Sequence, residues 1–237
     1  MTYRSLKAEC VIKTIDRLAL RIGERFPDSG LKGVAQGLGE AARRCAAAAA
    51  RLERPQHWIR VGVYAVWIAG AGAAATVASS LHYDGFDWDA TSLVQVFEPA
   101  MNIAVLIGIG VLTLGRLEER WKRARALDYL HELRSIAHVV DMHQLTKDPY
   151  RQASLLPMTA HSPNEALEGA LLERYFDYCS EMLSLTGKLA ALLAQSCRDP
   201  EVAAMAGDVE SLTTGLSRKI WQKIMLIGRI EHEKQIL

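Results

Sequence analysis

Two long apolar stretches stand out in the pattern of hydrophobic and polar positions along this chain. Val61–Leu81 contains no charged residue, and Leu93–Leu114 is apolar except for four polar side chains, Gln95, Glu98, Asn102 and Thr113. A helix over the first stretch rises about 31 Å, close to the thickness of the hydrocarbon core of a bilayer. The pattern therefore predicts two transmembrane helices, at about residues 59–81 and 93–115, joined by a short periplasmic loop at 82–92.

The charged residues that flank these stretches predict an orientation. Basic residues precede the first stretch and follow the second, whereas the loop at 82–92 carries no Lys or Arg. Because basic residues are enriched on the cytoplasmic side, we expect a protein of the inner (plasma) membrane with both termini in the cytoplasm. Five of these basic side chains are expected to contact lipid headgroups: Arg60, Arg116, Arg120, Lys122 and Arg123.

The segment before the first span, residues 1–56, has helical periodicity. Met1–Phe26 predicts an amphipathic helix, Pro27–Gly30 a turn, and Leu31–Glu53 a second helix. The apolar side of the first helix is expected to carry Leu6, Cys10, Ile15, Leu18 and Ile22.

Residues 116–237 predict further helices. The second span continues without Gly or Pro to Leu145, with a coiled-coil-like seam of Ala126, Leu130, Leu133, Ala137 and Val140. Thr146–Ser162 predicts a loop, Ser162–Glu165 a helix start, and Asp199 the cap of a final helix. A second seam consists of Leu172, Tyr175, Cys179, Met182, Thr186, Leu189, Leu193 and Ser196. We predict an all-α protein with a transmembrane hairpin at 57–115 and a cytoplasmic bundle built from 1–56 and 116–237.

Composition excludes several classes of function. The chain has 237 residues and a formal net charge of +1, and its basic residues cluster beside the predicted spans, so we expect no nucleic-acid binding. It carries no phosphate loop, nucleophile elbow or dinucleotide fingerprint, so we expect neither an enzyme nor a cofactor. The four cysteines lack metal-ligand spacing and are expected to be reduced, mostly buried thiols.

The polar side chains of the second span allow two interpretations. Gln95, Glu98 and Asn102 lie three and four positions apart and share one helix face, with Thr113 near the same face. In an oligomer this face lines a pore, where a ring of carboxylates favours cations. Alternatively, Glu98 reaches headgroup water and Asn102 bonds to a neighbouring helix. Small residues at intervals of four in the first span favour close helix contacts and self-association.

A group of histidines and carboxylates on the long helix is a second candidate site. Its members are Asp128, His131, Glu132, Ser135, His138, Asp141 and His143. A helical metal site needs matching ligands on a facing helix, and the nearest candidate row, Glu173, Asp177 and Glu181, contains no histidine. The sequence therefore favours a solvated or salt-bridged face involving Arg134, and no metal.

The layout of the spans resembles that of the SLATT-type two-helix membrane proteins of bacteria. The resemblance covers roughly residues 45–140 and rests on the second span running into Arg116-Leu117-Glu118-Glu119-Arg120-Trp121 and then Arg125–Leu133. It implies an oligomeric, pore-forming effector of nucleotide-signalled defence whose cytoplasmic part senses a signal.

Two functions follow from these patterns. The first is a homo-oligomeric ion channel or pore with a cytoplasmic sensing or gating bundle, contacting membrane lipids and a cytoplasmic protein or small-molecule signal. The second is a membrane-anchored scaffold without transport activity, whose last helix binds a partner protein around Trp221 and Met225. A polar opening along the oligomer axis distinguishes the first from the second.

Overall fold

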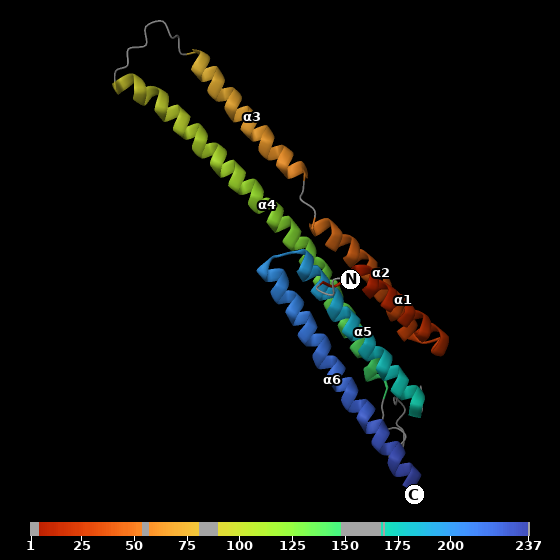
Figure 1. The fold of residues 1–237 in the computed structure, drawn as a ribbon. Coiled ribbons are helices and arrows are strands. Elements are labelled where there is room, and N and C mark those ends of the chain that lie inside the picture. Colours follow the sequence, from red (N-terminus) through yellow and green to blue (C-terminus); the bar gives the residue numbers. More distant parts are fainter. Residues whose placement is uncertain (1–4, 54–56, 81–89, 148–166, 168, 237) are drawn as a thin grey trace. The chain divides into compact units, whose positions relative to one another are not determined.

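The chain folds into helices, which confirms the predicted all-α class. The computed structural model describes residues 5–53, 57–80, 90–147, 167 and 169–236, and these contain no strand. The helices are α1 (Ala8–Arg25), α2 (Gly30–Glu53), α3 (His57–Ser80), α4 (Ala90–Leu145), α5 (Gly169–Ser196) and α6 (Pro200–Ile236) (Figure 1). Contacts divide the chain into a bundle unit, Met1–Glu53 with Arg123–Leu237, and a hairpin unit, Arg54–Lys122.

The first two helices of the bundle unit lie close to the predicted ranges. Four residues of α1 are buried at spacings of four, three and four: Val11, Ile15, Leu18 and Ile22. Cys10 is exposed, so its predicted place on the apolar side is wrong; Val11, one position and about 100° further round the helix, takes that place. The turn to α2 is closed by Ser29, whose hydroxyl donates to the Phe26 carbonyl at 2.9 Å.

The predicted helix start at Met1 is wrong within the described residues, because α1 begins at Ala8. Lys7 is extended, and Leu6 bonds to α5 instead of to its own helix. The Leu6 amide donates to Gln195 Oε1 at 3.0 Å, and Gln195 Nε2 donates to the Leu6 carbonyl at 3.4 Å. This pair of hydrogen bonds satisfies the backbone of Leu6 outside a helix.

α4 is one uninterrupted helix that contributes to both units. All five residues of its predicted seam, from Ala126 to Val140, are fully buried in the core of the bundle unit, which confirms the four-and-three spacing. The helix ends at Leu145 as the sequence predicts. The predicted loop and helix start between Lys147 and Leu167 lie outside the described residues.

α5 is the central helix of the bundle unit. It packs against α1, α2 and α6, and every residue of its predicted seam is buried. Phe26 adds an edge-to-face contact to Tyr175 of α5, with the ring centroids 5.5 Å apart. Since fully buried side chains dominate these contacts, apolar burial is the main source of stability in the unit.

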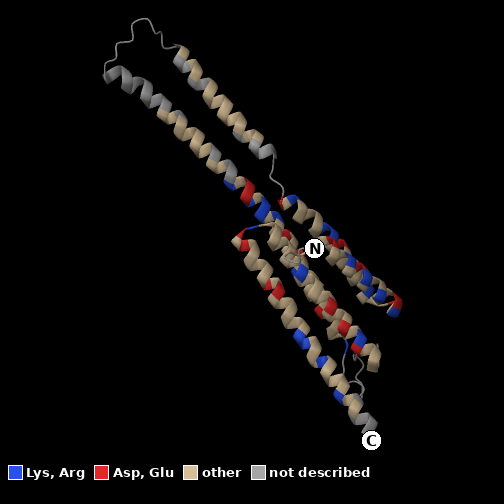
Figure 2. Cartoon of the chain, in the orientation of Figure 1, with Lys and Arg blue, Asp and Glu red and all other residues tan. Residues whose placement is uncertain are grey.

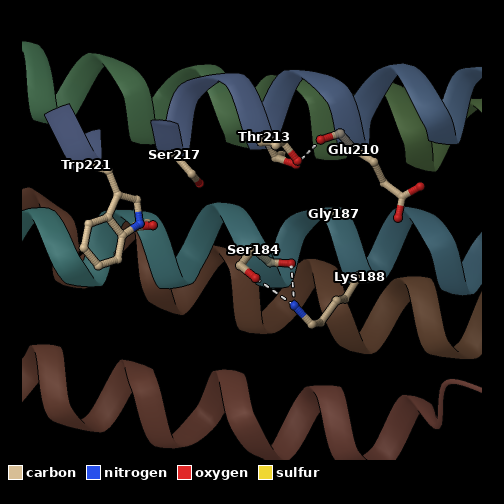
Figure 3. A pocket seen from close by; sticks show the side chains of 9 residues that line it. Ser184, Gly187, Lys188, Glu210, Thr213, Ser217 and Trp221 are labelled. Atoms are coloured by element: carbon tan, nitrogen blue, oxygen red, sulfur yellow. Dashed lines mark hydrogen bonds between the residues drawn. The ribbon is translucent and has the colours of Figure 1, made fainter. Parts of the chain in front are cut away.

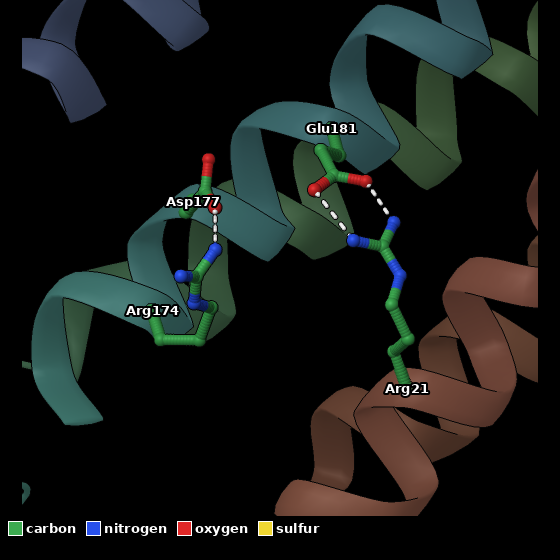
Figure 4. Close-up of polar contacts among 4 residues, drawn as sticks. All are labelled: Arg21, Arg174, Asp177 and Glu181. Atoms are coloured by element: carbon green, nitrogen blue, oxygen red, sulfur yellow. Dashed lines mark hydrogen bonds and ion pairs between the residues drawn. The ribbon is translucent and has the colours of Figure 1, made fainter. Parts of the chain in front are cut away.

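Ion pairs on the surface of the bundle join helices distant in sequence. Arg21 of α1 pairs with Glu181 of α5, and Arg44 of α2 pairs with Glu132 of α4. Within α5, Arg174 pairs with Asp177 at 2.7 Å (Figure 4). Exposed ion pairs of this kind contribute little to the free energy of folding. Their main effect is on the orientation of the helices relative to each other.

The hairpin unit consists of α3 and the part of α4 up to Lys122. Two glycines lie where its helices approach. A Cβ on Gly70 would clash with Ile107 Cδ1, and one on Gly110 would meet Val66 Cγ1 at 3.7 Å. The predicted small-residue contact therefore lies within the hairpin at Gly70. Gly62 and Gly70 both belong to the small residues spaced at multiples of four in the first span, but a Cβ on Gly62 would have nothing within 4 Å.

Large apolar side chains of the hairpin unit are exposed on several sides. Trp67 is 53% exposed and Ile68 73%, and on α4 Leu106 is 68% exposed. The described residues of α3, from Val61 on, carry no charge, whereas charged residues are frequent on the bundle helices (Figure 2). Within the parts of the chain that the structure describes, no helix meets both the length and the apolarity needed to cross a membrane.

Candidate functional site

Asn102 and Thr113 lie on one flank of α4, beside the contact with α3 that Ile107 and Gly110 form. Asn102 and Thr113 are exposed, while Ile107 lies against Gly70 of α3. At about 100° per residue, Asn102 and Thr113 both lie roughly 130° round the helix from Ile107, on the same side. The Thr113 hydroxyl donates to the Ile109 carbonyl at 2.7 Å, so its own donor is satisfied within the helix. Gln95 and Glu98 belong to α4, but their side chains lie outside the described residues.

The basic residues after the second apolar stretch have different surroundings. Arg116 and Arg120 are exposed. Lys122 pairs with Glu118 one turn earlier, at 2.9 Å. Arg123 belongs to the bundle unit and pairs with Asp199 and Glu201, which the sequence did not predict. The side chain of Arg60 lies outside the described residues.

Asp199 connects Arg123 to the start of α6. Its Oδ1 accepts the amide hydrogens of Glu201 at 2.9 Å and Val202 at 3.3 Å, which confirms the predicted helix cap. Its Oδ2 accepts from Arg123 Nε at 2.8 Å. Burial works to raise the pKa of Asp199, but the hydrogen bonds from Arg123, Val202 and Glu201 outweigh burial and lower that pKa. The Arg123 pKa is raised, mainly by the same hydrogen bond to Asp199.

The histidine and carboxylate face of α4 is a surface. Among the described residues, no three His, Cys, Asp or Glu side chains are grouped so as to hold a metal ion. His131 and His138 are exposed, and the Ser135 hydroxyl donates to the His131 carbonyl at 3.0 Å. Glu132 pairs with Arg44 of α2 in place of the predicted partner, Arg134. This arrangement fits a solvated face.

None of the four cysteines, all of which are described, forms a disulfide. Cys45, Cys179 and Cys197 are buried, and Cys10 is exposed. Burial raises the pKa of the Cys45 and Cys179 thiols to about 12, which suppresses their thiolate forms at neutral pH. Cys10 is therefore the accessible thiol of the folded chain.

A polar groove of about 370 Å³ lies between α5 and α6 (Figure 3). Gly187 and Thr213 are buried and form its floor, whereas Lys188, Glu210 and Trp221 are exposed at its rim. The other lining residues all carry hydroxyl groups: Ser180, Ser184, Thr214 and Ser217. Sequence reasoning missed this site because its residues alternate with the apolar seam on two different helices. The one local signal is Gly187, a glycine inside an otherwise strong helix pattern.

Gly187 allows α5 and α6 to approach at the groove floor. A Cβ at this position would lie 2.9 Å from Thr213 Oγ1 and 3.9 Å from the Glu210 Cα. Thr213 cannot move away easily, because it is buried and its hydroxyl donates to the Glu210 carbonyl at 3.0 Å. By contrast, a Cβ on Gly207 of α6 would have nothing within 4 Å.

We expect Gly187→Ala to destabilise the bundle by about 1 kcal/mol, because the overpacking cost exceeds the gain in helix propensity. Gly207→Ala is the matched control and should stabilise by about 0.5–1 kcal/mol, since it gains the same propensity without a contact. Urea denaturation of the two variants measures the difference. Equal stabilisation by both substitutions would contradict the close approach of the helices at Gly187.

The last helix carries the predicted partner-binding residues on its surface. Trp221 is 54% exposed and Met225 61%, and they lie one turn apart on the same side of α6.

Comparisons with protein-family models, with curated proteins and with solved structures found no match to this chain.

Proposed function

We propose that the chain is an integral inner-membrane protein that self-associates through its hairpin unit and forms an ion-conducting pore, with the bundle unit in the cytoplasm as its gate or sensor. The observation that carries this proposal is the polar face of α4. Asn102 and Thr113 are exposed on one flank of the helix, outside the contact that Ile107 and Gly110 make with α3. A single hairpin cannot enclose a path, so this face lines a pore only where several copies meet.

The apolar surface of the hairpin supports its insertion in a bilayer. The exposed side chains of Trp67, Ile68 and Leu112 cost free energy in water, and the hairpin unit does not cover them. The apolar stretches Val61–Leu81 and Leu93–Leu114, with basic residues on their outer flanks, match the pattern of two spans. Lipid and neighbouring copies of the chain would cover the exposed apolar side chains and would suit the two apolar stretches with their basic flanks.

Cys10 provides a direct test of insertion and orientation, because it is the accessible native thiol. In intact cells a membrane-impermeant maleimide should leave Cys10 unlabelled, and should label it once the inner membrane is opened. In a Cys10→Ser background, Phe86→Cys in the predicted outer loop should react in intact cells. Labelling of Cys10 in intact cells would contradict the orientation, and recovery of the protein in the soluble fraction would contradict insertion.

Planar-bilayer recording of the full-length protein tests the pore. We expect discrete currents that favour cations, a weaker cation preference in Glu98→Gln, and a several-fold smaller conductance in Asn102→Leu, because both changes remove polar groups from the path. Met101→Leu is the matched control, since Met101 is exposed on the neighbouring face of the same turn and the change keeps it apolar. An inserted protein that passes no current would rule out the pore and leave the membrane anchor.

A scaffold is the second candidate, favoured by the exposed Trp221 and Met225. Large aromatic and thioether side chains on a helix surface are typical centres of protein contacts. If α6 binds a partner protein, a photo-crosslinking residue at position 225 should capture one defined protein. The Trp221→Ala change should remove that product. Crosslinks to no protein would contradict the scaffold.

A further inference from the structure

The groove between α5 and α6 has the lining of a site for a densely hydrogen-bonding ligand. Hydroxyl groups from both helices face it, and each hydroxyl can donate and accept. Apolar ligands gain little from such a wall, because they leave its polar groups unpaired. The ligand must therefore offer several donors and acceptors in a small volume, as hydroxyl-rich molecules do.

Lys188 supplies a positioned positive charge at one end of the groove. Its ammonium donates to Ser184 Oγ at 2.7 Å and to the Ser184 carbonyl at 3.4 Å (Figure 3). An ammonium has three donors, so one remains for a ligand. Glu210 stands across the groove from Lys188, on α6, and within the described residues the two form no ion pair. The groove thus holds a cation for an acidic group, with hydroxyl groups beside it.

Trp221 supplies a flat apolar surface at the other end. Its indole lines the groove beside Ser217 and is about half exposed (Figure 3). The lining residues of α6 run from Glu210 to Trp221, eleven residues further along, so the groove extends about 16 Å along the helices. An indole face packs against another flat or weakly apolar face, and its N–H remains able to donate.

We infer that this groove binds an anionic monosaccharide, either a sugar acid or a sugar phosphate. The acidic group binds Lys188, the ring hydroxyls bind Ser184, Ser217 and the neighbouring hydroxyl groups, and the C–H face of the ring packs on Trp221. The volume of about 370 Å³ falls at the small end of ligand sites, which suits one sugar ring with an acidic substituent. A fatty chain would leave the hydroxyl groups and Lys188 unpaired, and a metal ion would find a single carboxylate among the lining residues.

Calorimetric titration of the full-length protein tests the inference, in a detergent without a sugar headgroup. The probes are glucuronate, glucose 6-phosphate and uncharged glucose, and the first two distinguish a carboxylate from a phosphate as the acidic group. We expect saturable binding of at least one anionic probe, at least tenfold tighter than that of glucose. Lys188→Met and Trp221→Ala should each weaken it at least tenfold.

Two control variants and one further lining variant keep the result specific. Lys13→Met, at an exposed site on α1, should leave binding unchanged, as should Met225→Ala, which does not line the groove. Ser184→Ala should weaken binding while keeping the charge, because it removes the hydroxyl that positions Lys188. Helix content measured by circular dichroism verifies that each variant folds.

The inference is overturned if neither anionic probe binds, if Lys188→Met binds as well as the wild type, or if a nucleotide or amino acid saturates the site and sugars do not. It does not rest on the proposed pore. Sugar binding is measured in detergent, and ion current is measured separately. A protein that conducts ions but binds no sugar would contradict the sugar site alone, and one that binds sugar but passes no current would contradict the pore alone.

Discussion

Leu133→Ala should lower the free energy of unfolding of the bundle unit by about 3 kcal/mol, while Leu145→Ala should change it by less than about 0.5 kcal/mol. Both leucines belong to α4. Leu133 is fully buried, whereas Leu145, at the end of the same helix, is 58% exposed. Truncation at Leu133 removes buried methyl groups and leaves a cavity, but truncation at Leu145 removes atoms that already contact solvent.

The measurement is urea denaturation followed through the near-ultraviolet signal of the buried tyrosines. Tyr175 and Tyr178 lie in the core of the bundle unit, so their signal reports on that unit. The slope of unfolding free energy against urea should be the same for both variants, because neither changes the surface exposed on unfolding by much. Similar losses from the two substitutions would mean that the α4 seam does not pack in the bundle core.

Local patterns along the chain predicted most of the helices, because helix formation and burial leave a periodic trace. The four-and-three spacing from Ala126 to Val140 identified both the helix and its buried side. The same reasoning failed at Cys10, since a small thiol is compatible with either side and Val11 fits the spacing better. Asp199 was predicted as a cap because capping depends on the next three residues alone.

Contacts between helices were beyond the reach of the sequence. The pairing of Arg123 with Asp199 and the groove floor at Gly187 depend on which helices are neighbours and how they are shifted along each other. Periodicity gives the buried face of each helix but not its partner. Ser184 and Ser217 are ordinary surface residues when each helix is taken alone, and they become a site only when α5 and α6 lie together.

Asp199→Ala should lower the free energy of unfolding by about 1–2 kcal/mol, because one side chain performs two tasks. It caps the first turn of α6 through the amides of Glu201 and Val202, and it accepts a hydrogen bond from Arg123 of α4. Asp199→Asn separates these tasks. An amide oxygen still caps the helix, but it carries no charge for the guanidinium, so the loss should be smaller than that of the alanine variant.

The pH dependence then identifies the charged contact. The pKa of Asp199 is lower in the folded chain than its ordinary value of 3.8. A carboxyl with a lowered folded pKa contributes its full stabilisation above the unfolded value, and it loses that contribution as the pH falls through the folded one. The difference in stability between wild type and Asp199→Asn should therefore be constant near neutral pH and shrink below about pH 3.8. A difference that persisted unchanged in acid would assign the stabilisation to the helix cap alone, and Arg123 would then not hold α4 against the start of α6.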